Sequence, residues 1–141
     1  MEGRGYQIFT AIQILAACAL VWGLATWPSP WNVQRYIGTA LVVVGISCIV
    51  IARYQLGKSF SLTPQARQLV TSGIYSKIRN PIYGFGAVMI TGVILVVQKP
   101  ALWIVLLIVV IGQTLRARRE ARVLEAAFGD AYREYRRKTW F

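Results

Sequence analysis

Residues 81–115, PIYGFGAVMITGVILVVQKPALWIVLLIVVIGQTL, contain two uncharged apolar runs that only the tripeptide QKP at 98–100 separates. The runs, residues 81–97 and 101–115, lie at or below the usual minimum of about 17 residues for a membrane-spanning helix. A break this short, with a proline in it, predicts two helices joined as a tight hairpin. A re-entrant pair is one arrangement open to such short helices, and a hairpin buried in protein or in a thin bilayer is the favoured one.

Two more apolar runs precede this hairpin. Residues 6–27 contain no charged side chain and are long enough to cross a bilayer. A cleaved signal peptide is less favoured, because the run is too long and no small-residue cleavage site of the usual form follows it. Residues 36–52 form the second run, between Arg35 and Arg53. The four runs predict an all-α integral membrane protein, a single membrane domain over residues 1–141 with about four transmembrane helices, of which the last two form a short helical hairpin.

The composition agrees with a membrane protein and excludes other classes. Hydrophobic residues make up 56% of the 141, yet the formal charge is +11, from 16 Lys and Arg against 5 Asp and Glu. A soluble nucleic-acid-binding protein reaches that charge but not that apolar content, and a disordered basic tail reaches neither the apolar nor the aromatic content. The chain has no His, which excludes His-ligated zinc, a Ser-His-Asp triad and imidazole acid–base catalysis. Cys18 and Cys48 lie inside apolar runs, as small hydrophobic helix residues do.

The charge distribution predicts how the helices cross the membrane, because cytoplasmic segments are enriched in Lys and Arg. With both termini in the cytoplasm, the loop 53–80 and the C-terminal helices 116–138 are cytoplasmic too, and only Arg35 and Lys99 lie on the other side. The 14 cytoplasmic cations are then Arg4, Arg53, Lys58, Arg67, Lys77, Arg79, Arg116, Arg118, Arg119, Arg122, Arg133, Arg136, Arg137 and Lys138. This bias explains the charge without a nucleic-acid partner.

The loop before the hairpin contains two helix-start signals. Thr63 as an N-cap followed by Pro64 predicts a short helix through Leu69, and Asn80 as an N-cap followed by Pro81 predicts the start of the third span. The second signal places the unpaired N–H groups of a helix N-terminus at the cytoplasmic face. Such a helix end is suited to binding an anionic group.

The tail after residue 115 is helical by its pattern. Arg116 and Glu120 are four residues apart, at the point where the fourth span leaves the membrane, and on spacing alone an ordinary surface ion pair is the favoured interpretation. Gly129 ends this helical run. Tyr132 and Tyr135 then share one face of a final short helix.

Three segments occur in order around the hairpin: LGKSFSLTP at 56–64, QLVTSGIYSKIRNPIYGFG at 68–86 and REARVLEAAFGDAYREYRR at 119–137. Together they resemble the isoprenylcysteine carboxyl methyltransferase family, which is related to the phospholipid methyltransferases. That family has L-G-[RK]-S-[FW]-S, then L-V-x-x-G-x-Y-x-x-[VI]-R-[HN]-P-x-Y, and, after a short hairpin, R-x-x-x-E-E-x-x-L-x-x-x-F-G-x-x-Y-x-x-Y. Three ordered motifs are a specific signal. Asn80 stands where the motif has His, and Ala121 where it has the second Glu.

The resemblance implies an integral membrane methyltransferase that uses S-adenosyl-L-methionine and lacks a soluble Rossmann-type domain. It implies a cytoplasmic cofactor site between the loop, the start of the hairpin and the C-terminal helix. By motif position that site is lined by Tyr75, Ile78, Arg79, Asn80, Pro81, Tyr83 and Glu120. The catalytic roles fall to Arg116 and Glu120, with Arg116 holding the carboxylate of the acceptor or of the cofactor.

The implied reaction moves a methyl group to a lipophilic acceptor that enters from the bilayer, such as the carboxylate of a prenylated cysteine or a similar amphiphile. One alternative is N-methylation of a phospholipid amine, which needs a proton acceptor such as Glu120. Another is a non-catalytic membrane protein that binds lipid or assists assembly. The expected partners are the lipid bilayer and the lipophilic acceptor, and neither nucleic acid nor metal is expected.

Overall fold

The computed structural model describes residues 2–57 and 69–140, and this part of the chain is helical, as the sequence predicts. It contains a short 3-10 helix, η2 (Gly73–Ser76), and four α-helices: α1 (Glu2–Ala25), α2 (Val33–Leu56), α3 (Pro81–Val97) and α4 (Leu102–Lys138). The described residues form no strand, only an isolated bridge between Ile78 and Trp140. The short helix predicted to open at Thr63 lies outside the described residues.

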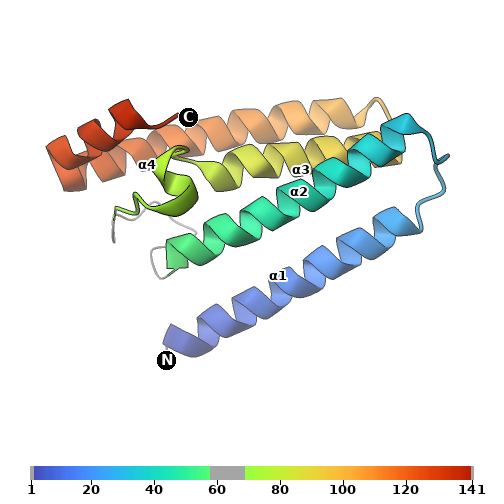
Figure 1. Cartoon of the computed structure of the whole chain (residues 1–141), viewed down its shortest axis with the longest axis horizontal. Coiled ribbons are helices and arrows are strands. Elements are labelled where there is room, and N and C mark those ends of the chain that lie inside the picture. The colour runs from blue at the N-terminus through green and yellow to red at the C-terminus, as the bar shows by residue number, and fades with distance from the viewer. Residues whose placement is uncertain (1, 58–68, 141) are drawn as a thin grey trace.

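The helices α2, α3 and α4 lie side by side with α3 in the middle, and α1 diverges from them toward the N-terminus (Figure 1). The connections 26–32 and 98–101 lie together at one end of the molecule, here called the opposite end. Residues 69–80 and the C-terminal part of α4 lie at the other, here called the site end. The hairpin α3–α4 is confirmed, and α4 continues as a helix well beyond residue 115.

One described helix, α2, is long and apolar enough to cross a membrane, judged by length and composition. Shorter apolar helices occupy Thr10–Ala25 and Pro81–Val97. Many large apolar side chains of α1, α2 and α4 face outward, among them Ile12, Leu15, Val43 and Ile108. Exposing so many large apolar side chains to water costs free energy, whereas lipid solvates them well. This surface is therefore consistent with a membrane protein. The four-span topology stays a prediction.

Glycines allow α2 and α3 to touch along their backbones. A Cβ added to Gly92 would lie 2.6 Å from the carbonyl oxygen of Gly38, and one added to Gly45 would lie 2.9 Å from Cα of Met89. Ala52, seven residues beyond Gly45, is fully buried on the same helix. Small residues at helix interfaces let backbones approach closely, which is how helices associate within lipid. This contact is therefore the centre of the fold.

Arg35 joins α1 to α2 at the opposite end. Its side chain is buried, with only 2% of the residue exposed, and its guanidinium lies 4.0 Å from the ring centroid of Trp31. The guanidinium donates to the carbonyl oxygens of Leu24 at 3.0 Å and Ala25 at 3.4 Å, and also to that of Ser29. The last carbonyls of α1 thereby gain a cationic partner, which is favourable at a helix C-terminus.

We expect Arg35→Ala to lower the free energy of unfolding by about 2–3 kcal/mol, because it leaves the last carbonyls of α1 without their charged donor. Thermal unfolding in detergent measures the loss. Lys99→Ala is the matched control, since Lys99 is an exposed cation at the same end, 5.7 Å from the Trp27 ring. Equal losses in both variants would contradict a specific role for Arg35.

Candidate functional site

The N-terminus of α3 begins where the sequence predicts it, with Asn80 at the N-cap and buried Pro81 in the first turn. The expected side-chain cap is wrong, because the Asn80 side chain makes no capping hydrogen bond. Its ψ of 57° departs from the extended backbone of Asn32, which has ψ 175° and does cap α2. The carbonyl oxygen of Asn80 instead accepts the N–H groups of Tyr83 and Gly84, each at 3.1 Å.

A three-residue cluster joins the first turn of α3 to α4. The Tyr83 hydroxyl donates to Oε1 of Glu120 at 2.6 Å, and Nε of Arg116 donates to the same oxygen at 3.0 Å. The predicted ion pair of Arg116 and Glu120 is thus confirmed, and Tyr83 is brought to it. The hydrogen bond to Glu120 raises the pKa of Arg116. Both charged side chains are partly exposed, at 39% for Arg116 and 25% for Glu120, so a ligand can reach them.

Tyr75 is buried beside this cluster. Its backbone carbonyl oxygen accepts a hydrogen bond from the Tyr135 hydroxyl at 2.8 Å. Burial raises the pKa of the Tyr75 phenol above its usual value, and the nearby Tyr135 and Glu120 raise it further. Burial also raises the pKa of Tyr135 to about 12, while the charge of Arg79 acts in the opposite direction. Both phenols are neutral at physiological pH, as tyrosines ordinarily are, and Glu120 lies near Tyr75 while Arg79 lies near Tyr135.

The backbone on either side of Ile78 is paired with the end of the chain. The Trp140 N–H donates to the Lys77 carbonyl oxygen at 2.7 Å, and the Arg79 N–H donates to the Trp140 carbonyl oxygen at 3.0 Å. The Arg79 side chain has a buried Nε with no hydrogen-bond partner among the described residues. A buried donor without a partner is unusual in a folded protein and is suited to an anionic ligand. The residues around Trp140 in the sequence do not predict that it pairs with the backbone of residues 77–79.

Gln55, near the end of α2, holds η2 from the other side. Its Oε1 accepts the N–H of Ile74 at 2.8 Å. Gly73 adopts a φ of +62°, and a Cβ there would collide with the Gln55 side chain. The motif glycine at this position is therefore favoured by its backbone conformation, and a larger residue would also displace the end of the Gln55 side chain. Sequence reasoning missed Gln55, because its partner is on another element.

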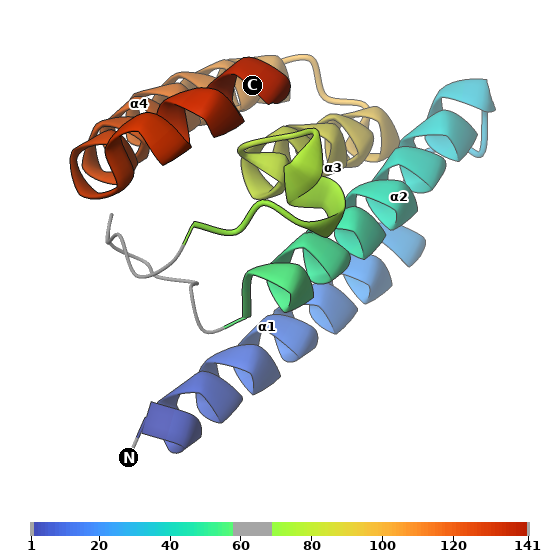
Figure 2. The ribbon, with the colours of Figure 1, turned by 60° about the vertical axis from the view of Figure 1, so that its left-hand side comes forward.

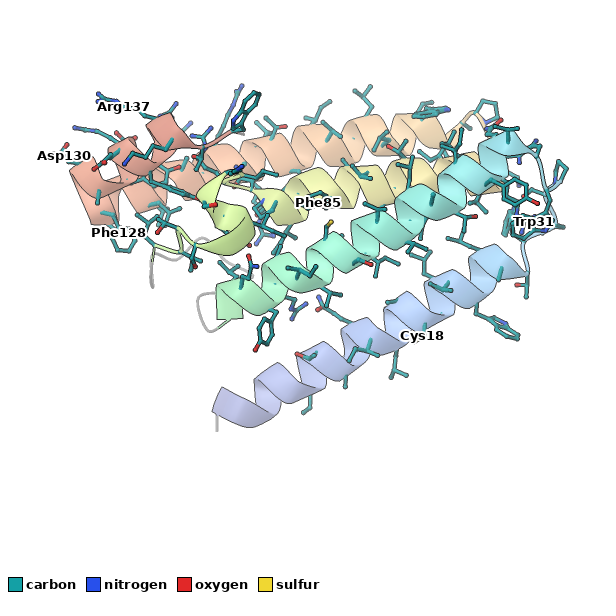
Figure 3. All side chains as sticks on the ribbon, viewed as in Figure 1. Cys18, Trp31, Phe85, Phe128, Asp130 and Arg137 are labelled. Atoms are coloured by element: carbon teal, nitrogen blue, oxygen red, sulfur yellow. The ribbon has the colours of Figure 1, made fainter. Side chains whose placement is uncertain are left out.

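The C-terminal part of α4 turns back on itself at Gly129 (Figure 2), as the predicted break there requires. Gly129 has φ 50° and ψ −121°, a conformation that glycine adopts most readily. Figure 3 shows Asp130 at the tip of this turn, and its carboxylate pairs with Arg133 at 3.2 Å. The reversal brings Tyr135 back to η2, where its hydroxyl meets Tyr75. Tyr132 lies beside Tyr135 with the ring centroids 6.3 Å apart, and the two residues are 3% and 9% exposed.

All of the predicted site residues lie at the site end. The structure brings Tyr75, Tyr83, Arg116 and Glu120 together, and it ties Ile78 and Arg79 to Trp140. The remaining two, Asn80 and Pro81, form the start of α3 between these groups. In the described ranges, no three His, Cys, Asp or Glu side chains gather as metal ligands would.

The chain matches a known protein family. The model of the phospholipid methyltransferase family matches residues 33–131. This range begins with α2 and extends through η2, α3 and α4 to just beyond Gly129, and it includes every predicted site residue. No curated protein and no solved structure matches the chain.

Proposed function

The chain belongs to the phospholipid methyltransferase family of membrane methyltransferases, and on this premise we propose that it transfers a methyl group from S-adenosyl-L-methionine to a lipophilic acceptor. The observation that carries the proposal is the cluster of Tyr83, Glu120 and Arg116, where α3 and α4 meet the tethered segment 75–79. A single carboxylate held by a phenol and a guanidinium, beside a helix N-terminus, provides binding groups for both charges of an amino acid.

The side chains present fit the charged parts of the cofactor, which when bound supplies a methyl group on a positively charged sulfur. The buried Nε of Arg79 and the N-terminus of α3 suit its carboxylate. The Glu120 carboxylate suits its ammonium, because Tyr83 and Arg116 both bind Oε1 and no described residue donates to Oε2. The face of the Tyr83 ring suits a sulfonium, as aromatic faces attract cations.

The role of these residues in the reaction is to position the reactants. Methyl transfer is an in-line displacement, so orientation and exclusion of water can supply much of the rate. Tyr83 and Arg116 fix the Glu120 carboxylate, and the tethers at Tyr75 and Trp140 fix the backbone that leads into α3. A chain without His can work in this way, since no proton has to be moved when the acceptor is already a nucleophile.

For the acceptor we propose a carboxylate on a lipophilic molecule, such as a prenylated cysteine or a similar amphiphile. This acceptor needs no base, and Arg116 is a suitable cation to hold it. The second candidate is a phospholipid amine, which the description of the matching family favours. An amine must lose its proton, and in this site Glu120 is the carboxylate that could accept it.

We also propose that all four helices cross the membrane, with both termini and the site in the cytoplasm. Apolar side chains on the outer faces of α1, α2 and α4 support this arrangement. The opposite end, made of the connections 26–32 and 98–101 and the first turn of α2, contains only two cations, Arg35 and Lys99. The cytoplasmic side is then the one that is rich in Lys and Arg, as in membrane proteins generally.

The test is to incubate the purified protein, in lipid nanodiscs, with methyl-labelled S-adenosyl-L-methionine and either a membrane lipid extract or a synthetic prenylcysteine. We expect label in the lipid fraction. Mild alkali separates the two acceptors, since it releases the label from a methyl ester as methanol but leaves an N-methyl group in place. The absence of both transfer and cofactor binding at millimolar concentration would overturn the proposal in favour of a non-catalytic membrane protein.

A further inference from the structure

Residues 130–140 form a strap that runs back from Gly129 toward the start of α3 (Figure 2). The strap is attached to the segment 75–79 at two points. The Tyr135 hydroxyl donates to the Tyr75 carbonyl oxygen, and the Trp140 backbone exchanges hydrogen bonds with Lys77 and Arg79. Both attachments go to the backbone of the segment, so they determine where its side chains lie.

Two neighbouring tyrosines of the strap differ in the hydrogen bonding of their hydroxyl groups. Tyr132 and Tyr135 are both buried and lie on the same face. The Tyr135 hydroxyl has a defined acceptor at 2.8 Å, whereas the Tyr132 hydroxyl donates to none of the described residues. A tyrosine that only packs needs its ring and not its hydroxyl. Burying a hydroxyl costs free energy of desolvation unless the hydroxyl forms a hydrogen bond. The Tyr135 hydroxyl is therefore in place for its hydrogen bond, and Tyr132 for its packing.

The carbonyl that Tyr135 holds belongs to the segment 75–79, which leads directly into the start of α3. The Tyr75 side chain lies near enough to Glu120 for the carboxylate to act on its phenol. Arg79 follows four residues later, and its charge acts on the Tyr135 phenol in turn. Gln55 fixes the other end of this segment through the N–H of Ile74. A shift of the Tyr75 backbone would thus move groups on both sides of the site.

We propose that Tyr135 is a positioning residue, whose hydroxyl holds the Tyr75 backbone so that Tyr75 and Arg79 are correctly placed for the cofactor. This inference rests on the proposed function, because the cofactor is the ligand that the positioned groups receive. Tyr135 does not itself touch the reacting atoms. It acts through a loop whose binding-competent conformation must be populated for the ligand to bind tightly.

The test compares Tyr135→Phe with Tyr132→Phe in the full-length protein in nanodiscs. Each change removes one hydroxyl from a buried ring of the strap. We expect Tyr135→Phe to raise deuterium uptake in the peptide spanning 74–80 and to raise the Kd for S-adenosyl-L-methionine about three- to tenfold, the effect of one hydrogen bond. Tyr132→Phe should change neither quantity, and both variants should unfold at similar temperatures.

Other outcomes overturn the inference in distinguishable ways. Unchanged uptake in Tyr135→Phe would show that the hydroxyl does not hold the segment. Raised uptake with an unchanged Kd would show that the tether exists but does not position the site. An equal rise of Kd in both variants would reduce Tyr135 to a packing role. If the wild-type protein binds no cofactor, the proposed function fails, and with it the positioning role, whatever the uptake shows.

Discussion

Glu120→Ala is expected to abolish S-adenosyl-L-methionine binding, and Glu120→Gln to weaken it by about one to two orders of magnitude. Glutamine keeps the size of the side chain but removes the charge that faces the cofactor ammonium, and a charge-assisted hydrogen bond of this kind is worth about 1.5–3 kcal/mol. It also weakens the bonds from Tyr83 and Arg116, which together fix the carboxylate at 2.6 and 3.0 Å. Calorimetric titration of the solubilised protein measures the change.

Glu125→Gln is the matched control for this experiment. Glu125 lies on the same helix, one turn further along, and pairs with Arg133 at 2.8 Å in place of any site residue. Five residues correspond to about 140° around the helix axis, so its side chain leaves α4 in a different direction from that of Glu120. We expect a Kd within about twofold of wild type. Equal weakening by Glu120→Gln and Glu125→Gln would mean that the cofactor binds elsewhere.

Gly92→Leu is expected to cost more than about 4 kcal/mol of stability, or to prevent folding, because it separates α2 from α3. Even a single Cβ at Gly92 would lie 2.6 Å from the Gly38 carbonyl oxygen and 2.7 Å from the backbone nitrogen of Val42. Both contacts are with backbone, which cannot move aside as a flexible side chain can. Fluorescence-detected size-exclusion chromatography after heating measures the fraction of protein that stays folded.

Gly112→Leu is the control, because Gly112 is an exposed glycine of α4 with nothing within 4 Å of the position of an added Cβ. The substitution adds the same side chain to a neighbouring apolar helix and should be tolerated. If Gly92→Leu were as stable as Gly112→Leu, α2 and α3 would not be packed as closely as described above. The proposed site would then lose its support, since Gln55 on α2 holds the segment that leads into α3.

Local features of this protein follow from its sequence. The break at 98–100 divides α3 from α4, Pro81 marks the first turn of α3, and Gly129 ends the straight part of α4. The pairing of Arg116 with Glu120 belongs to the same class, since residues four apart on a helix are neighbours. Each of these features depends on backbone geometry or spacing within a few residues, which the order of amino acids specifies directly.

The rest was decided only by the tertiary structure. Tyr83 meets Glu120 from 37 residues away, and Tyr135 meets Tyr75 from 60. The capping role predicted for Asn80 failed for a related reason, because its backbone conformation departs from the extended one that a side-chain cap requires. Such contacts depend on how closely the glycines let α2 approach α3 and on the angle at which the chain reverses at Gly129. No local sequence pattern specifies either of these two quantities. The sequence therefore predicts the helices and the ion pair of Arg116 with Glu120, whereas the packing of the helices brings the rest of the site together.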